Sequence, residues 1–168
     1  MFICKYCGTE FLEHSPNCPN CGAPIKVSDK VSKKEDTKSI REVCAKYDGT
    51  RSLYVNEIIE PKRMATVHDE FNIPANETII MVYDDTVFGS NKVGFAICAG
   101  GLYWKNDWSV DTNRNFLTWA DFAEREIKLD GYHIQLGRGD VIGAAGVGDD
   151  KARERIVKLF GEIKSLLS

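Results

Sequence analysis

Residues 93–105, Val-Gly-Phe-Ala-Ile-Cys-Ala-Gly-Gly-Leu-Tyr-Trp-Lys, decide how the main part of this chain folds. Two short apolar runs, Val93 to Cys98 and Leu102 to Lys105, flank the tripeptide Ala99-Gly100-Gly101. Glycines between two apolar runs are typical of the tight turn in an antiparallel hairpin. The stretch therefore predicts two neighbouring strands of an antiparallel sheet.

More strands are predicted on both sides of this hairpin. Thr78 to Tyr83 is a continuous apolar run of strand length. Residues 126–129 and 132–136 alternate apolar and polar side chains around Asp130-Gly131. Asp-Gly provides the positive backbone angles that a tight hairpin turn requires. We therefore expect strands between residues 75 and 136, with a second hairpin at the end of this region.

Helical spacing of apolar residues predicts helices before and after the strands. The first helical region is expected over residues 39–71, where Pro61 must start or kink a helix. The closing helix is expected over residues 149–167, which carry one apolar stripe. Between strands and closing helix, the glycine-rich residues 137–148 lack the Lys-Ser/Thr of a phosphate-binding loop and are interpreted as a flexible connection. This order of elements predicts the α+β class.

Cysteines at the N-terminus form two pairs with the spacing of metal ligands. The pairs lie in Cys4-Lys5-Tyr6-Cys7-Gly8 and Cys18-Pro19-Asn20-Cys21-Gly22. Two intervening residues let both thiolates of a pair reach one ion, and four thiolates complete the tetrahedral shell of zinc without an open position. Cys4, Cys7, Cys18 and Cys21 are therefore predicted to hold one structural Zn²⁺ ion. An iron centre of the rubredoxin type would use the same four ligands, whereas His14 is interpreted as a surface residue.

These two knuckles resemble the short zinc ribbons found at the N-termini of many bacterial and archaeal proteins. The predicted ribbon covers residues 1–27, and a charged linker is expected over residues 28–38. One larger domain is then expected over residues 39–168. The resemblance implies that the ribbon serves as a rigid adaptor.

The larger domain has a recurring rhythm of strand and turn. It is carried by Val82 to Ser90, by Gly94 to Cys98, by Gly101-Leu102-Tyr103-Trp104 and by a predicted strand with the Trp-x-Asp-Phe motif of residues 119–122. With the hairpin and helix that follow, this pattern resembles bacterial PH-like domains, in which a strongly bent antiparallel sheet is plugged by a C-terminal helix. The resemblance implies a binding or assembly module, and no catalytic residues come with it.

Composition and charge narrow the function classes. The formal net charge is −3 and no basic stripe is visible, which disfavours nucleic acid as the main partner. Asp84 and Asp85 follow the first predicted long strand and would repel phosphate, which disfavours lipid binding. No apolar run approaches the roughly 20 residues that span a bilayer, and no signal-like segment precedes Cys4, so a cytoplasmic location is expected.

Aromatic residues provide the candidate contact surface. Tyr103, Trp104 and Trp108 are the candidate partner-binding residues, and Trp108 falls in the loop-like sequence Lys105-Asn106-Asp107-Trp108-Ser109. An exposed tryptophan in a loop is a typical anchor for a protein partner. Cys44 and Cys98 stand among apolar neighbours and are predicted to be core residues.

The function expected from the sequence is non-enzymatic: a zinc-binding adaptor that recognises a protein partner or self-associates. One alternative is a regulator that binds nucleic acid through the ribbon and the segment from Lys26 to Lys38. A second alternative is a small metal-assisted hydrolase built around His68, Asp84 and Asp85, which requires these side chains to converge in a pocket.

Overall fold

The chain forms two compact units, Met1–Glu35 and Asp36–Ser168, which are described separately. The computed structural model describes residues 2–3, 10–11, 20, 29–49, 53–55, 60–86, 88–146 and 150–167. In the first unit, strands β1 (Phe2–Ile3) and β2 (Glu10–Phe11) pair antiparallel, with Phe2 opposite Phe11 and Ile3 opposite Glu10.

Helix α1 (Asp29–Ala45) begins well before the expected helical region. It includes almost all of residues 28–38, so the part of this segment from Asp29 onward is helical and not an extended linker. The segment is rich in Lys, which has high helix propensity, but it has few apolar residues whose spacing could reveal a helix. The boundary between the two units falls inside α1.

A five-stranded antiparallel sheet forms the centre of the second unit, in the order β3-β4-β5-β6-β7. Its strands are β3 (Leu53–Val55), β4 (Ile79–Asp84), β5 (Gly94–Cys98), β6 (Gly101–Lys105) and β7 (Phe116–Thr118). The predicted hairpin around Ala99-Gly100 is confirmed, with Ile97 opposite Leu102. Every residue of β4 and β5 is buried, because both faces of these central strands are covered.

The expected helical region over residues 39–71 is wrong for residues 53–55, which form strand β3. Strand β3 interrupts the region and pairs with β4, so tertiary pairing overrides the helical spacing there. Helix α2 (Pro61–Glu70) then begins at Pro61, where the proline's missing N–H costs no helical hydrogen bond.

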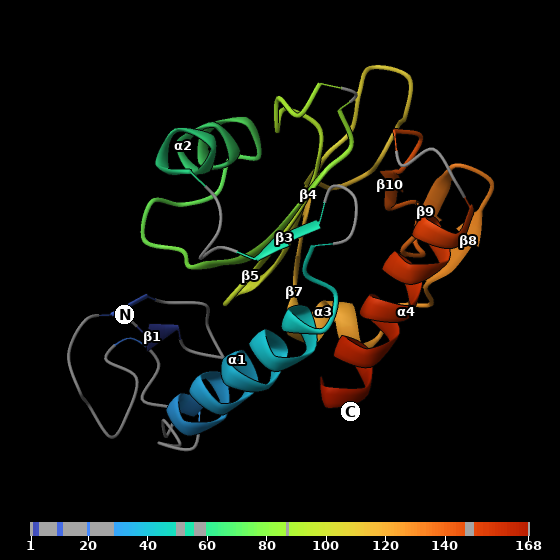
Figure 1. Cartoon of the computed structure of the whole chain (residues 1–168). Helices are drawn as coiled ribbons and strands as arrows, with labels where there is room; N and C mark the ends of the chain where they lie inside the picture. The colour runs from blue at the N-terminus through green and yellow to red at the C-terminus, as the bar shows by residue number, and fades with distance from the viewer. Residues whose placement is uncertain are drawn as a thin grey trace. The chain divides into compact units, whose positions relative to one another are not determined.

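Two hydrophobic clusters lie on opposite faces of the large sheet (Figure 1). One contains Val67 and Phe71 from α2 and its C-terminal end, together with Val82 of β4. The larger cluster joins the other face to α1, α4 and the second sheet. A register shift between Ile79 and Met81 turns both Ile80 and Met81 towards this larger cluster.

The second sheet has three antiparallel strands in the order β10-β9-β8. They are β8 (Lys128–Asp130), β9 (His133–Gln135) and β10 (Val141–Gly143). The predicted hairpin is present, but Asp130 pairs with His133, so the turn residues are Gly131 and Tyr132. Strand β10 lies within the glycine-rich residues 137–148, and this part of the segment is therefore not the flexible connection expected from its composition.

Two helices complete the second unit. Helix α4 (Asp150–Leu167) occupies the stretch in which the closing helix was expected and packs an apolar face into the larger cluster. Residues 119–123, expected to be a strand, form the short helix α3 (Trp119–Ala123). The hydroxyl of Thr118 accepts a hydrogen bond from the Asp121 amide at 3.1 Å and caps this helix. None of the helices in the described residues is long and apolar enough to cross a membrane.

Candidate partner-binding surface

Two loops leave the same end of the five-stranded sheet. Residues 85–93 connect β4 to β5, and residues 106–115 connect β6 to β7 (Figure 1). They lie at one end because β4, β5, β6 and β7 are consecutive antiparallel neighbours. Loops held by such a scaffold are frequent sites of recognition.

Each loop presents one aromatic side chain to solvent. Phe88 in the first loop and Trp108 in the second are both 95% exposed. Trp108 lies in a loop, as its sequence predicted, and the structure adds that its side chain is exposed. Side chains of this size are seldom left uncovered without a role in binding when they gather in one area.

Carboxylates give the first loop a defined shape. The buried side chain of Asp84 accepts hydrogen bonds from the Thr86 amide at 2.9 Å and the Asn91 amide at 3.1 Å. This is the local turn bonding that Asp provides, so the turn interpretation explains Asp84 without any catalytic role. Phe88 therefore projects from an organised loop.

The second loop is organised in the same way. The carboxylate of Asp107 accepts hydrogen bonds from the amide of Ser109 at 2.8 Å and from its hydroxyl at 2.5 Å. The bond from this hydroxyl is the main reason that the pKa of the Asp107 carboxyl is below its usual range. Trp108 stands between these two residues, so its backbone is fixed while its ring is exposed.

Strand β10 and the residues after it join the two loops. The side-chain oxygen of Asn106 accepts from the Gly143 amide at 2.9 Å, and its nitrogen donates to the Val141 carbonyl at 2.9 Å. The Gly146 amide donates to the carboxylate of Asp85 at 2.8 Å. The second sheet therefore positions both loops.

Asp85 sits at the base of the first loop. Its carboxylate oxygen accepts from the Gly146 amide and also from the Tyr83 hydroxyl. Burial raises the pKa of this carboxyl, although both hydrogen bonds oppose the rise. A partly buried carboxyl that accepts these two hydrogen bonds links β4 to the segment after β10.

A third exposed aromatic residue lies close to the loops. Tyr132 is 62% exposed in the β8–β9 turn, and its carbonyl accepts from the Ala144 amide at 2.9 Å. The neighbouring His133 pairs with Gly143, whose amide donates to Asn106, so this turn lies near the second loop. We call Phe88, Trp108 and Tyr132 the aromatic surface. Within the described residues, the remaining exposed large apolar side chain is Leu166, at 43%.

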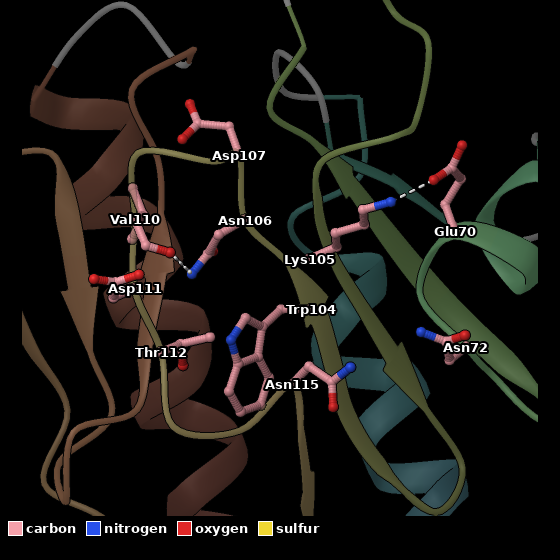
Figure 2. Close-up of a pocket in the computed structure, with 10 residues that line it drawn as sticks. All are labelled: Glu70, Asn72, Trp104, Lys105, Asn106, Asp107, Val110, Asp111, Thr112 and Asn115. Atoms are coloured by element: carbon pink, nitrogen blue, oxygen red, sulfur yellow. Dashed lines mark hydrogen bonds and ion pairs between the residues drawn. The ribbon is translucent and has the colours of Figure 1, made fainter.

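A cavity of about 370 Å³ opens beside the second loop (Figure 2). Its lining includes the ion pair between Lys105 and Glu70, whose contact lowers the pKa of the Glu70 carboxyl. The carboxylates of Asp107 and Asp111 also line it, and neither has a Lys or Arg partner within the described part of the chain.

The other two predicted contact residues are buried. Tyr103 is 7% exposed and its ring packs against Phe116 with centroids 4.3 Å apart. Trp104 is 0% exposed and faces the larger cluster on the opposite side of β6. Alternation along the strand sends these adjacent side chains into different cores, so Tyr103 and Trp104 serve packing and not surface contact.

The side chains of the hydrolase alternative do not converge. Asp84 and Asp85 are held by separate groups, as described above, and His68 Nδ1 lies 3.3 Å from the carbonyl oxygen of Ile73. Each of these three side chains contacts groups of its own neighbourhood and not the other two. Among the described residues, no group of three or more His, Cys, Asp or Glu side chains is placed to hold a metal ion.

The predicted zinc ligands Cys4, Cys7, Cys18 and Cys21, and His14 between them, lie outside the described residues. Cys44 and Cys98 are described and are buried core thiols, as expected. Burial raises the pKa of the Cys44 thiol to about 12, which makes it a poor nucleophile.

Sequence reasoning missed Phe88 and Tyr132. Phe88 stands between the turn residues Asp84-Asp85-Thr86 and Gly89-Ser90, and an apolar residue inside a turn sequence is a readable sign of exposure. Tyr132 is in phase with Ile134 and Leu136, which are buried, but it is exposed because the hairpin turn is placed one residue later than the sequence predicts. Comparison with protein families, curated proteins and solved structures finds no match to this chain.

Proposed function

We propose that this chain is a non-enzymatic, zinc-binding adaptor that recognises a protein partner, or a second copy of itself, through the aromatic surface. The observation that carries the proposal is the exposure of Phe88 and Trp108, 95% each, on two neighbouring loops of one sheet. Large aromatic side chains in an organised setting are the usual centres of protein interfaces.

The order of elements supports a PH-like binding module. A meander that includes β4 to β7 is followed by a three-stranded meander, β8 to β10, and by the closing helix α4. The order of antiparallel strands followed by a closing helix agrees with the resemblance to PH-like domains, but the strands form two sheets instead of one strongly bent sheet, and β3 is an additional strand at a sheet edge. A module of this kind contributes recognition and no catalytic residues.

A zinc ribbon at the N-terminus is the second part of the proposal. The pairing of β1 with β2 brings together the chain on either side of Cys4 and Cys7, as a hairpin carrying a metal knuckle would. Four thiolates would fill the shell of one Zn²⁺, leaving no position for a substrate. The ribbon would then be a rigid second contact surface.

The test is a pull-down from native cytosol with the full chain as bait. We expect a stoichiometric protein partner with the wild type, and its loss with Trp108→Ala or Phe88→Ala. Leu166→Ala removes an exposed apolar side chain from the last turn of α4 and serves as the matched control. Cys18→Ser/Cys21→Ser in the same experiment reports the contribution of the ribbon.

Other outcomes would redirect the proposal. Nucleic acid recovered by the bait and released by salt would favour the regulator alternative. A partner retained equally by wild type, Trp108→Ala and Phe88→Ala would remove the aromatic surface from the proposal.

A further inference from the structure

The loop that carries Phe88 is accompanied by positive charge. Arg63 is an exposed residue of α2, and its Nη2 atom would lie 3.5 Å from a Cβ added at Gly89, the neighbour of Phe88 in the loop. Among the described residues, no carboxylate forms an ion pair with Arg63. The guanidinium is therefore a cation beside Phe88 that the described part of the chain leaves available to a partner.

A second cation lies in the same loop. The side chain of Lys92 is 63% exposed, and its Nζ atom is 3.9 Å from the carboxylate of Glu70. This carboxylate is in closer contact with Lys105, so two lysines share one negative charge and leave an excess of positive charge. We call Arg63 and Lys92 the basic flank of the aromatic surface.

The loop that carries Trp108 has charge of the opposite sign. Asp107 and Asp111 are exposed, and neither forms an ion pair with a Lys or Arg of the described residues. Figure 2 shows these two carboxylates at the left and the contact between Lys105 and Glu70 at the right. We call Asp107 and Asp111 the acidic flank of the aromatic surface.

Flanks of opposite sign around an apolar centre make a surface that is complementary to itself. A two-fold rotation about an axis between Phe88 and Trp108 brings the basic flank of one copy to the acidic flank of the other, at both ends of the contact. The same rotation brings Phe88 of each copy to Trp108 of the other. A second copy of the chain thus supplies, without any further requirement, both the charges and the aromatic rings that this surface can match.

We propose that the partner bound at the aromatic surface is a second copy of this chain, in a two-fold symmetric dimer in which each basic flank faces an acidic flank. This inference rests on the proposed function and names its partner. The acidic flank alone does not carry it; the argument is that flanks of both signs border the same two exposed rings, Phe88 and Trp108. The rings are expected to provide most of the affinity, and the flanks to set the orientation of the two copies.

The first measurement is sedimentation velocity of the full-length protein over a range of micromolar concentrations. We expect a monomer–dimer equilibrium for the wild type. Phe88→Ala/Trp108→Ala is expected to raise the dissociation constant about 30-fold or more, because it removes the aromatic centre of the contact.

A charge exchange tests which flanks face each other. Arg63→Glu/Lys92→Gln and Asp107→Asn/Asp111→Lys change the charge of the two flanks by equal and opposite amounts. Each variant alone is expected to dimerise about tenfold more weakly than the wild type, because flanks of like charge then meet. An equimolar mixture of the two variants should form a heterodimer with about the wild-type affinity, since opposite charges meet again at both ends. Native mass spectrometry distinguishes this heterodimer from the two homodimers by mass.

The substitutions are chosen to keep the fold intact. Asp107→Asn retains the oxygen that accepts from Ser109, so the second loop should keep its shape. Lys92→Gln leaves Glu70 in contact with Lys105. Circular dichroism and urea unfolding of each variant confirm that it is folded.

Matched controls make the same changes of charge at exposed positions of α1 and α4. They are Lys38→Gln/Lys158→Glu and Glu42→Gln/Glu154→Lys, and both should dimerise as the wild type does. Leu166→Ala is the control for the loss of an exposed apolar side chain.

The outcomes separate this inference from the proposed function. If the wild type is a monomer at every concentration, the dimer inference fails, and a partner recovered in the pull-down and lost with Trp108→Ala would leave the aromatic surface in place. A dimer that persists in Phe88→Ala/Trp108→Ala uses another surface and overturns the inference. Failure of the mixed charge variants to form a heterodimer, or equal weakening in the matched controls, would show that the two flanks do not face each other and would also overturn it.

Discussion

At the scale of single residues, the most deeply buried charged side chains among the described residues are Arg125 and Asp140, each 1% exposed. Arg125 Nη2 and Asp140 Oδ2 are 3.0 Å apart, but the geometry is not that of a linear hydrogen bond, so the contact is chiefly electrostatic. Arg125 also donates to the Gly137 carbonyl at 3.0 Å. The pair connects the end of α3 to the β9–β10 loop, which supports β10 and, through it, the two aromatic loops.

We expect Arg125→Met to lower the free energy of unfolding by about 3–5 kcal/mol, because it leaves a buried carboxylate uncompensated. Adding Asp140→Asn should restore part of the loss, since the unpaired charge is then removed. Urea unfolding of the single and double variants measures the coupling. Arg138→Met, which breaks an exposed contact with Glu124 at 3.4 Å, should cost less than about 1 kcal/mol. If the losses in unfolding free energy caused by Arg125→Met and Asp140→Asn simply add in the double variant, the expected coupling is contradicted.

Asp85 predicts a second effect at this scale, a dependence of stability on pH. Its folded-state pKa is raised by burial, so the folded protein binds a proton more readily than the unfolded chain. Ionisation of Asp85 therefore costs stability as the pH rises from its unfolded pKa, near about 3.9, through the folded pKa. Asp85→Asn keeps the oxygen that accepts from Tyr83 and Gly146 and removes the charge.

The measurement is urea unfolding of wild type and Asp85→Asn between about pH 4 and pH 7.5. The stability of the variant relative to wild type should increase with pH through this window and then level off. A difference that stays constant, or that decreases with pH, would show that burial does not dominate at Asp85.

At the scale of elements, two glycines in similar free space have opposite roles. Gly131 has φ +57° in the β8–β9 turn, and Gly161 lies inside α4; an added Cβ would meet no atom within 4 Å at either position. Gly131→Ala should destabilise by about 1 kcal/mol because alanine disfavours positive φ. Gly161→Ala should stabilise by about 1 kcal/mol because alanine favours a helix interior. Thermal unfolding of both variants measures the direction of each stability change. A change in the same direction for both variants would contradict the backbone geometry assigned to these two glycines.

Some elements of the fold were predictable from the sequence pattern and others were not. The β5–β6 hairpin and the closing helix were predictable because apolar spacing and turn glycines agree there. Helix α3 was not, since Trp119 to Phe122 is short and aromatic and was interpreted as a strand. The spacing of Thr118 and Asp121, a cap residue followed by an acidic residue in the first turn, was the signal that would have identified it.

At the scale of the whole molecule, the two units are expected to respond separately to metal removal. The described hydrophobic clusters are made of residues from Ile40 to Ile163 and their neighbours, all inside the second unit. A zinc ribbon without a core of its own would depend on its ion for folding. Native mass spectrometry should therefore find one zinc per chain, lost in Cys18→Ser/Cys21→Ser.

The unfolding of the second unit provides the control for this expectation. Chelation of zinc should leave the cooperative urea transition of the second unit unchanged within about 0.5 kcal/mol, because the predicted metal ligands and the described core belong to different units. If native mass spectrometry finds iron instead of zinc, the predicted four-thiolate site stands and the predicted identity of the metal is wrong. A large loss of stability in the second unit on chelation would show that the units are coupled.

The sequence by itself determined the α+β class, the β5–β6 and β8–β9 hairpins and the position of Trp108 in a loop. These follow from local patterns, since the alternation of apolar residues and the turn residues act over a few neighbours. Tertiary structure alone decided that Tyr103 and Trp104 are core residues, that β3 joins the sheet and that Asp107 and Asp111 border one cavity. The physical reason is that burial and charge pairing depend on segments distant in sequence, which no local pattern records.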